Sequence, residues 1–379
     1  MTRHEVYIGL GSNLGDRMGL LQEALALIFR YIGAVAEVSS VFETPSVGFE
    51  GPDFLNACCQ VDTFLEPNEV LTKLNTIELE LGRTRTVSNG YVSRLIDLDI
   101  LFFDKRVISN AKLKIPHPRL HRRLFVLEPL IEIANHMVHP LLDKPISELR
   151  LECHDTSTIV KTKMELTLPN KMFSFNHRIN YLVLEGNIGS GKTSLANLIA
   201  REFNGKLVLE RFADNPFLPK FYKDPERYAF TLEMSFLADR YQQITDDLAQ
   251  LNLFKEFVVS DYYVYKSLIF SKITLPEEEF KLYRTLFYQM YKELRRPDIY
   301  IYLYQNTDRL RLNIEKRGRS YEQEISEEYL DRIQKGYLDF LRNQPDLTVK
   351  IIDITEKDFM EKREDFIWVL NKIEEVSSF

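Results

Sequence analysis

The sequence predicts an α+β domain with a largely antiparallel sheet, followed by an α/β domain with a parallel sheet flanked by helices. Its 379 residues exceed the usual length of one domain. Strand and helix patterns mix irregularly in the first part, whereas apolar strand runs alternate with long helical patterns in the second. We expect residues 1–165 and 179–379 to form the two domains and residues 166–178 to link them.

The composition narrows the class of protein. Hydrophobic residues make up 45% of the chain and charged residues 28%, as in ordinary globular proteins. A net charge of −7 argues against a dedicated nucleic-acid binder. Three cysteines, two of them the neighbours Cys58 and Cys59, argue against a disulfide framework and fit a reducing compartment. No run approaches the roughly 18 apolar residues that span a bilayer, and no signal region opens the chain. We therefore expect a cytoplasmic protein without a membrane partner.

The elements expected in the first domain come from hydrophobic periodicity. Gly82 is placed to end the second helix, and a polar, basic loop follows it. The expected strands cover 6–10, 35–42, 54–61 and 95–103, and the expected helices cover 18–31 and 69–81.

The most informative stretch of this domain contains Asp97 and Asp99. Residues two apart in a strand share a face, so the two carboxylates project together while Leu98 and Ile100 face the core. Two carboxylates at so short a distance repel each other unless a cation lies between them. Mg²⁺ prefers oxygen ligands of this kind. By itself, the pair is better explained by a sheet edge that faces solvent. Several arginines surround it, however, and they point to a metal–polyphosphate site: Arg83, Arg85, Arg94, Arg122 and Arg123.

Seven short segments carry a family resemblance over about residues 4–150. They occur in one order at 11–14, 44–45, 54–57, 82–85, 94–99, 116–118 and 125–130. Together they resemble 6-hydroxymethyl-7,8-dihydropterin pyrophosphokinase of the folate pathway. The resemblance implies a ferredoxin-like α+β fold. It also implies transfer of the β,γ-pyrophosphoryl group of ATP to the hydroxymethyl oxygen of the pterin, with release of AMP.

The same resemblance implies individual roles. Asp97 and Asp99 are expected to hold two Mg²⁺ between the ATP phosphates. The expected contacts of ATP phosphates or ribose are Arg83, Arg94, His117 and Arg123, with Glu78 nearby. The expected pterin site contains Thr44, Pro45, Phe54, Asn56 and Phe125, of which Phe125 stacks on the ring. Two positions depart from the family: Tyr91 replaces a loop tryptophan, and Pro118 replaces a frequent aromatic residue.

The second domain begins with a glycine loop, residues 186–193. It fits the pattern Gly-x-x-x-x-Gly-Lys-Ser/Thr of a phosphate-binding loop, and its members are Gly186, Asn187, Ile188, Gly189, Ser190, Gly191, Lys192 and Thr193. A buried strand pattern precedes it and a helical pattern follows it, which is the order that phosphate binding requires. Lys192 is expected to reach the outer phosphates of ATP and Thr193 to bind Mg²⁺. The alternative is a plain glycine-rich turn.

Further strand runs predict a parallel sheet, in which ligands collect at the carboxyl ends of the strands. The runs cover 206–209, 256–260, 298–303 and 349–352. Glu210 and Asp261 end two of these runs, so we expect both acids near the phosphates. A helix at 310–318 leads into a basic segment, 316–320, that suits a mobile lid. A solvated charge run is the alternative interpretation of that segment.

A second family resemblance covers about residues 180–375. Its segments are 186–193, 210–211, 215–218, 221–225, 236–240, 260–262 and 317–322. They resemble the deoxynucleoside kinases, which implies a homodimer and transfer of the ATP γ-phosphate to the 5′-hydroxyl of a deoxynucleoside. The implied roles are a general base at Glu210, 3′-hydroxyl ligands at Tyr222 and Glu322, lid arginines at Arg317 and Arg319, and Mg²⁺ ligands at Thr193 and Asp261.

Two departures bear on the substrate of this half. Glu233 stands where the family has a glutamine that reads the base, and a carboxylate only accepts hydrogen bonds. We expect a purine deoxynucleoside. Tyr262 stands where the family has an arginine near the base and the 5′-hydroxyl, a loss for which Arg240 or Arg211 could compensate.

The leading hypothesis is a bifunctional enzyme with two ATP sites and small-molecule substrates. One alternative makes the second half a nucleoside monophosphate kinase. Another makes one half a catalytically silent scaffold, which the departures at Tyr91 and Tyr262 favour.

Overall fold

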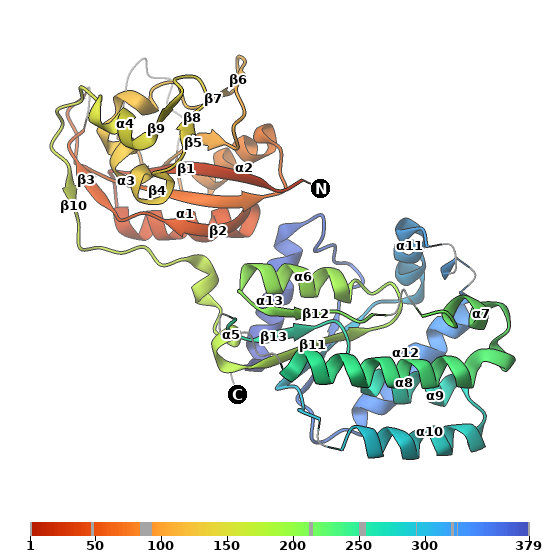
Figure 1. The fold of residues 1–379 in the computed structure, drawn as a ribbon. Helices are drawn as coiled ribbons and strands as arrows, with labels where there is room; N and C mark the ends of the chain where they lie inside the picture. Colours follow the sequence, from red (N-terminus) through yellow and green to blue (C-terminus); the bar gives the residue numbers. More distant parts are fainter. Residues whose placement is uncertain are drawn as a thin grey trace. The chain divides into compact units, whose positions relative to one another are not determined.

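The computed structural model shows two compact units, Met1–Met172 and Phe173–Phe379 (Figure 1). It describes residues 2–46, 49–83, 93–211, 215–249, 255–292, 294–319, 322–323 and 325–377. The division between the units lies within the segment 166–178 that the sequence predicts as a linker. Tyr91, Arg85 and lid residue Ser320 lie outside the described residues.

The first unit contains a sheet with the order β10-β3-β4-β1-β5, and β2 also pairs with β4. All of these pairs are antiparallel, which confirms the expected character of the sheet. The strands are β1 (His4–Ser12), β2 (Gly33–Val38), β3 (Phe42–Thr44), β4 (Phe54–Thr63), β5 (Asp97–Phe103) and β10 (Val160–Lys161). Two hairpins accompany them: β6 (Ile108–Ser109) with β7 (Lys114–Ile115), and β8 (Val138–His139) with β9 (Lys144–Pro145).

The single strand expected at 35–42 was wrong, because the chain forms β2 and β3 instead. The interruption falls at Ser39 and Ser40. The Ser39 hydroxyl accepts the backbone N–H of Cys58 at 2.9 Å, so a side chain replaces a backbone partner in the ladder. The Ser40 N–H donates to the Glu132 carboxylate at 2.7 Å and leaves the sheet. After this interruption the chain enters β3 as a separate strand, which ends at Thr44.

Helices cover this sheet. They are α1 (Arg17–Tyr31), α2 (Pro67–Glu80), α3 (Leu124–Ala134) and α4 (Ile146–Leu151), with short 3₁₀ turns at Leu120–Arg122 and Pro169–Met172. The Asp16 carboxylate caps α1 by accepting the N–H of Gly19, and Glu66 and Glu69 form a capping box at α2. α3 packs Leu127 and Leu130 against Leu101 of β5, and these side chains are buried.

The second unit contains the order β12-β13-β11-β14-β15, and all pairs are parallel, as expected. The strands are β11 (Tyr181–Gly186), β12 (Lys206–Val208), β13 (Val258–Ser260), β14 (Ile299–Tyr304) and β15 (Val349–Asp353). The chain passes from β11 to β12 and β13 on one side, and then to β14 and β15 on the other. The strand order therefore reverses beside β11, where open α/β sheets form a ligand crevice.

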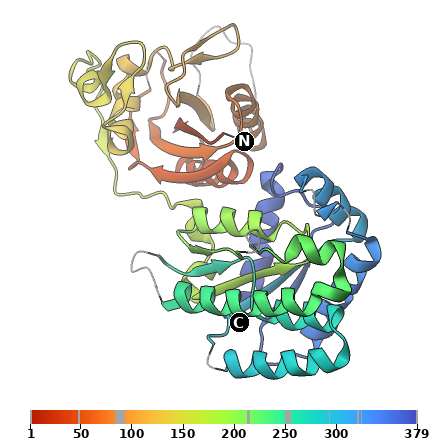
Figure 2. The ribbon, with the colours of Figure 1, turned by 45° about the vertical axis from the view of Figure 1, so that its right-hand side comes forward.

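Helices flank both faces of this sheet (Figure 2). α6 (Lys192–Glu202) packs on β11 and β13, and α13 (Arg363–Ser377) on β14 and β15. α8 (Pro225–Ala249), α9 (Tyr265–Thr274), α10 (Glu277–Met290) and α12 (Glu327–Arg342) pack together around buried tyrosines. The remaining helices are α5 (Phe175–Arg178), α7 (Leu218–Lys223) and α11 (Thr307–Arg317). Gly318, with φ 71°, ends α11.

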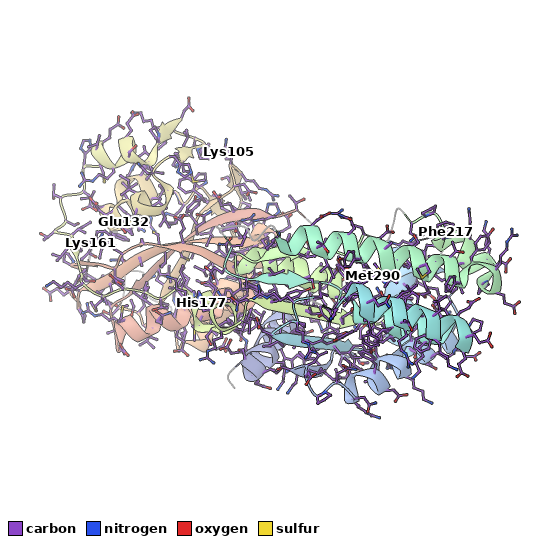
Figure 3. All side chains as sticks on the ribbon, turned by 60° about the horizontal axis from the view of Figure 1, so that its bottom comes forward. Lys105, Glu132, Lys161, His177, Phe217 and Met290 are labelled. Atoms are coloured by element: carbon purple, nitrogen blue, oxygen red, sulfur yellow. The ribbon has the colours of Figure 1, made fainter. Side chains whose placement is uncertain are left out.

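The apolar stripe of α10 is only partly available to a second subunit. Leu282 is exposed, Leu286 and Met290 pack partly against the core of their own unit (Figure 3), and Leu294 lies beyond the end of the helix. None of the described helices combines the length and the hydrophobicity needed to cross a lipid bilayer.

Replacing Leu127 with alanine should destabilise the first unit by about 2–5 kcal/mol, because it leaves a cavity under α3. Leu127 is 0% exposed, and the matched control Leu151→Ala removes a side chain that is 79% exposed. The control should change stability by less than about 0.5 kcal/mol. Chemical denaturation followed by circular dichroism measures the effect.

The single tryptophan, Trp368 on α13, reports the second unit alone. We expect its fluorescence transition to stay unchanged in Leu127→Ala. A Trp368 transition that shifted together with the first unit would contradict two independently folding units.

Candidate active sites

A cavity of about 1810 Å³ lies in the first unit. All residues that the sequence predicts for the first site line it: Thr44, Pro45, Phe54, Asn56, Glu78, Arg83, Arg94, Asp97, Asp99, His117, Arg123 and Phe125. Residues from β1, β3, β4, β5, α2 and α3 thus meet in one place. The sequence reasoning missed other lining residues, among them Arg119, Lys144, His154 and Asp155.

Glycines of β1 keep the floor of this cavity open. Gly11 lies between Asn56 of β4 and Asp97 of β5 in the strand register. A Cβ atom on Gly11 would lie 3.2 Å from Asn56 Oδ1. Because the position between them carries no side chain, the carboxylate and the amide reach the same space.

The acidic pair of β5 is held by arginines. Asp97 Oδ1 accepts Nη1 of Arg83 at 3.0 Å and Nη1 of Arg94 at 2.7 Å. Arg83 also pairs with Glu78 of α2, whose Oε1 accepts the backbone N–H of Leu98 at 2.9 Å. Leu98 and Ile100 are buried, which confirms the predicted alternation of the strand.

Burial sets the protonation of this site. Burial and the neighbouring charge of Asp97 raise the pKa of Asp99 to about 6. Burial also raises the pKa of Glu78 to about 7. His117 lies 3.9 Å from Asp99, and burial with the charges of Arg123 and Arg119 lowers its pKa to about 4. Glu78 and Asp99 therefore take up a proton more readily than free carboxylates do, whereas the His117 imidazole is neutral at physiological pH.

No set of three or more His, Cys, Asp or Glu side chains in the described part of the chain forms a metal site. Asp97 and Asp99 could supply two oxygen ligands, and the remaining ligands would come from a bound nucleotide or water.

At the other end of the cavity, Asn56 Nδ2 donates to Thr44 Oγ1 at 2.8 Å. Both side chains are buried, so their orientation is fixed. Phe125 lies in the first turn of α3, and the Arg123 guanidinium lies 5.3 Å from the centre of its ring. This end offers a flat aromatic surface beside a polar edge.

A connector, residues 152–162, braces this end of the cavity. Its Asp155 carboxylate accepts the N–H of Leu124 at 3.0 Å and caps α3 from outside the helix. Its Lys161 donates to Glu132 of α3 at 2.7 Å (Figure 3). Its strand β10 pairs with β3, which carries Thr44. The connector therefore contacts the elements that carry Phe125 and Thr44.

In the second unit, the glycine loop joins β11 to α6. Gly189 and Gly191 both have φ 81°, a conformation that favours glycine. Asn187 Nδ2 donates to the Leu330 carbonyl at 2.8 Å, and the Gly189 carbonyl accepts Asn313 Nδ2 at 2.9 Å. Lys192 Nζ donates to the Asn187 carbonyl at 3.2 Å. Helices α11 and α12 thus fix the loop, and the N-terminus of α6 opens onto it.

Asp261 connects the loop to the next strand. Its Oδ2 accepts the Thr193 hydroxyl at 2.5 Å, and its Oδ1 accepts the backbone N–H of Glu210 at 2.8 Å. The three predicted residues Thr193, Glu210 and Asp261 are thus in contact at the carboxyl ends of the strands.

The Glu210 carboxylate is buried between two cations. Arg240 donates to Oε1 from Nε at 3.0 Å and from Nη2 at 2.6 Å, and Lys266 Nζ donates to Oε2 at 2.6 Å. Burial opposes the charge of Glu210, but Lys266 and Arg240 outweigh it and hold its pKa well below the usual range. Of the two arginines that the sequence offered as substitutes, Arg240 contacts Glu210, whereas Arg211 is exposed.

Sequence reasoning missed Lys266. The available signal was a lysine in the first turn of α9, shortly after Asp261. Tyr262, at the position of the missing arginine, is buried in the core and cannot replace that arginine at Glu210.

Two further buried carboxylates each have one oxygen that accepts no hydrogen bond from the described residues. Glu233 Oε1 accepts the Thr274 hydroxyl at 3.0 Å, and Oε2 is the open atom. Burial raises the pKa of Glu233 to about 7. Glu322 Oε1 accepts Arg319 Nη1 at 3.1 Å and lies 3.5 Å from Arg317 Nη2, and Oε2 is again open. Open buried acceptors of this kind suit a ligand that brings donors.

Comparison with known proteins gives the family of each unit. Residues 182–378 match the model of the deoxynucleoside kinases, and residues 7–135 match that of 7,8-dihydro-6-hydroxymethylpterin-pyrophosphokinase. The deoxyguanosine kinase of Bacillus subtilis (strain 168) is 32% identical over 52% of this chain and 97% of its own length. The chain belongs to both families.

A second relative supports the first half. The 2-amino-4-hydroxy-6-hydroxymethyldihydropteridine pyrophosphokinase of Bacillus subtilis (strain 168) is 47% identical over 35% of this chain and 78% of its own length.

A solved structure of deoxyadenosine kinase from M. mycoides is 26% identical, covers 51% of this chain and 98% of that chain, and has a TM-score of 0.43. Both families use ATP, so the chain is a bifunctional kinase.

Proposed function

We propose that the chain transfers pyrophosphate from ATP to 6-hydroxymethyl-7,8-dihydropterin and, at a separate site, phosphorylates the 5′-hydroxyl of a purine deoxynucleoside. The observation that carries the first assignment is one cavity that holds an acidic pair, several arginines and a polar–aromatic end. The contact of Glu210 and Thr193 with Asp261 carries the second. The strand order β5-β1-β4-β2, crossed by α1 and α2, supports a ferredoxin-like fold for the first half.

In the first site, the protein positions ATP and pterin and neutralises charge. Asp97 and Asp99 would hold Mg²⁺, which supplies positive charge at the ATP phosphates when bound. Arg83 and Arg94 already face Asp97 and supply donors for phosphate oxygens. His117 is neutral and can donate a hydrogen bond. Phe125 stacks on the pterin while Asn56 reads its edge, which orients the hydroxymethyl group toward ATP.

In the second site, the glycine loop and Lys192 hold the ATP phosphates, and Thr193 and Asp261 would hold Mg²⁺. Glu210 accepts the hydrogen bond of the 5′-hydroxyl. Because its pKa is low, Glu210 is ionised at neutral pH and acts mainly by orienting that hydroxyl. This suits a loose transition state, in which bond formation to the attacking oxygen is small and its proton leaves late.

Glu322 and Glu233, the two buried carboxylates with an open oxygen, are the proposed contacts of the sugar and the base. Glu322, with Tyr222 of α7, would bind the 3′-hydroxyl, and the paired Arg317 and Arg319 would move to the phosphates. Glu233 would read the base. An ionised carboxylate accepts two N–H donors, which the guanine edge offers at N1 and N2. The similarity to a deoxyguanosine kinase supports guanine as the preferred base.

We also propose a homodimer formed through the second half. Leu282 and Tyr288 expose apolar surface on α10, and the family resemblance supports this assembly. Size-exclusion chromatography with light scattering tests the proposal.

Product analysis tests both activities in one preparation. ATP with the hydroxymethyl-dihydropterin should give AMP. ATP with each of the four deoxynucleosides in turn should give ADP and a monophosphate, fastest with deoxyguanosine. If either acceptor gives no product, the corresponding half is a scaffold or uses another substrate.

Replacing Asp97 with alanine should slow AMP formation by about 10²–10³-fold, because it removes a carboxylate that holds Mg²⁺ and orients Arg83 and Arg94. ADP formation with deoxyguanosine should stay unchanged. Glu23→Ala, on the exposed face of α1, is the control. An Asp97→Ala chain that still formed AMP at the wild-type rate would refute the first assignment.

Replacing Glu233 with glutamine should lower the ratio of kcat/KM for deoxyguanosine over deoxyadenosine by about tenfold or more, since one carboxylate acceptor becomes a donor. The wild-type ratio should also fall between about pH 8 and pH 6. The pKa of Glu233 is raised to about 7, so its carboxyl gains a proton as the pH falls through this range. In Glu233→Gln the ratio should not vary with pH. If the ratio varied equally with pH in both proteins, a group other than Glu233 would cause the pH effect.

A further inference from the structure

Glu210 receives its two cations from different elements and on different oxygens. Arg240 of α8 binds Oε1 with two N–H groups, and its Nη1 donates to the Ser267 hydroxyl at 2.7 Å. Its guanidinium also lies 4.7 Å from the centre of the Phe236 ring. Arg240 is therefore fixed on several sides and holds one oxygen of the carboxylate.

Lys266 of α9 holds the other oxygen. Its Nζ lies 2.6 Å from Glu210 Oε2, and the Lys266 and Glu210 side chains are only 11% and 6% exposed. Without Lys266, Oε2 would lose this donor in a nearly dry site, a costly arrangement for a carboxylate. The Phe270 ring, 5.4 Å from Nζ, limits where the ammonium can go.

We propose that Lys266 is a positioning residue of the deoxynucleoside kinase site, which fixes Glu210 Oε2 so that the carboxylate can receive the 5′-hydroxyl. It takes over the place of the arginine that Tyr262 has replaced. The proposal rests on the proposed role of Glu210. In the reaction, the 5′-oxygen bonds to the γ-phosphorus, the bond from that phosphorus to the β,γ-bridging oxygen breaks, ADP leaves, and the hydroxyl proton passes to Glu210. Lys266 exchanges no proton.

The test compares Lys266→Met, Lys266→Arg and Lys272→Met in the full chain. Lys272 is an exposed lysine of the same helix and serves as the matched control. We expect Lys266→Met to lower kcat for deoxyguanosine by about 10²-fold, with KM changed by less than about threefold. Lys266→Arg should recover kcat to within about tenfold of the wild type. AMP formation by the first half should be unchanged in all three proteins.

A double-mutant cycle with Glu210→Gln separates positioning from folding. If Lys266 acts through Glu210, adding Lys266→Met to Glu210→Gln should lower kcat by less than about threefold more. Full additivity of the two losses would overturn the proposal, as would a Lys266→Met protein with wild-type kcat. Equal losses in Lys266→Met and Lys266→Arg would show a packing role and also overturn it. If Glu210→Gln alone retained full activity, the proposed role of Glu210 would fail, whatever Lys266 does.

Discussion

Carboxylates removed from water are the constraint on which both sites depend. A buried carboxylate is stable only if cations or hydrogen bonds replace its hydration. In the first unit, the buried carboxylate is Glu78, and its pKa rises to about 7 because its pairing with Arg83 offsets only part of this cost. In the second unit, Arg240 and Lys266 offset it fully, and the pKa of Glu210 falls. Burial therefore dominates in the first site and raises the pKa of its carboxylate, whereas the cations dominate in the second site and lower the pKa of Glu210.

This difference matches what each site must receive. In the first site, the proposed metal–nucleotide complex would add positive charge beside Glu78 and the acidic pair of β5. Glu210 already has its cations, so it remains ionised without a ligand, which suits the role toward a neutral hydroxyl that we propose for it. The folds contribute accordingly. In the first sheet, the glycines of the interior strand β1 leave room for the cavity, whereas in the second sheet the reversal of strand order beside β11 brings the acids and the glycine loop together at one edge.

Much of this arrangement could be predicted from local patterns. The alternation around Asp97 and Asp99 gave the correct face because it depends only on the pleat of one strand. The glycine loop was recognisable because its strand and helix are its immediate neighbours. Lys266 was missed because its partner, Glu210, and their shared neighbour Arg240 come from separate elements that meet only in the folded sheet. The break at Ser39 was missed because it depends on a hydrogen bond to a distant strand. The placement of ATP, pterin and deoxynucleoside remains a prediction from family resemblance.

The connector at 152–162 has a consequence for the solubility of the first enzyme. β10 is the last strand beside β3, so it covers backbone groups that would otherwise form an open sheet edge. Open edges invite pairing with other chains, and short edge strands with a lysine, here Lys161, discourage it. A pyrophosphokinase cut before Val160 would present β3 to neighbouring molecules. We therefore expect the segment that leads to the second unit also to protect the first from aggregation.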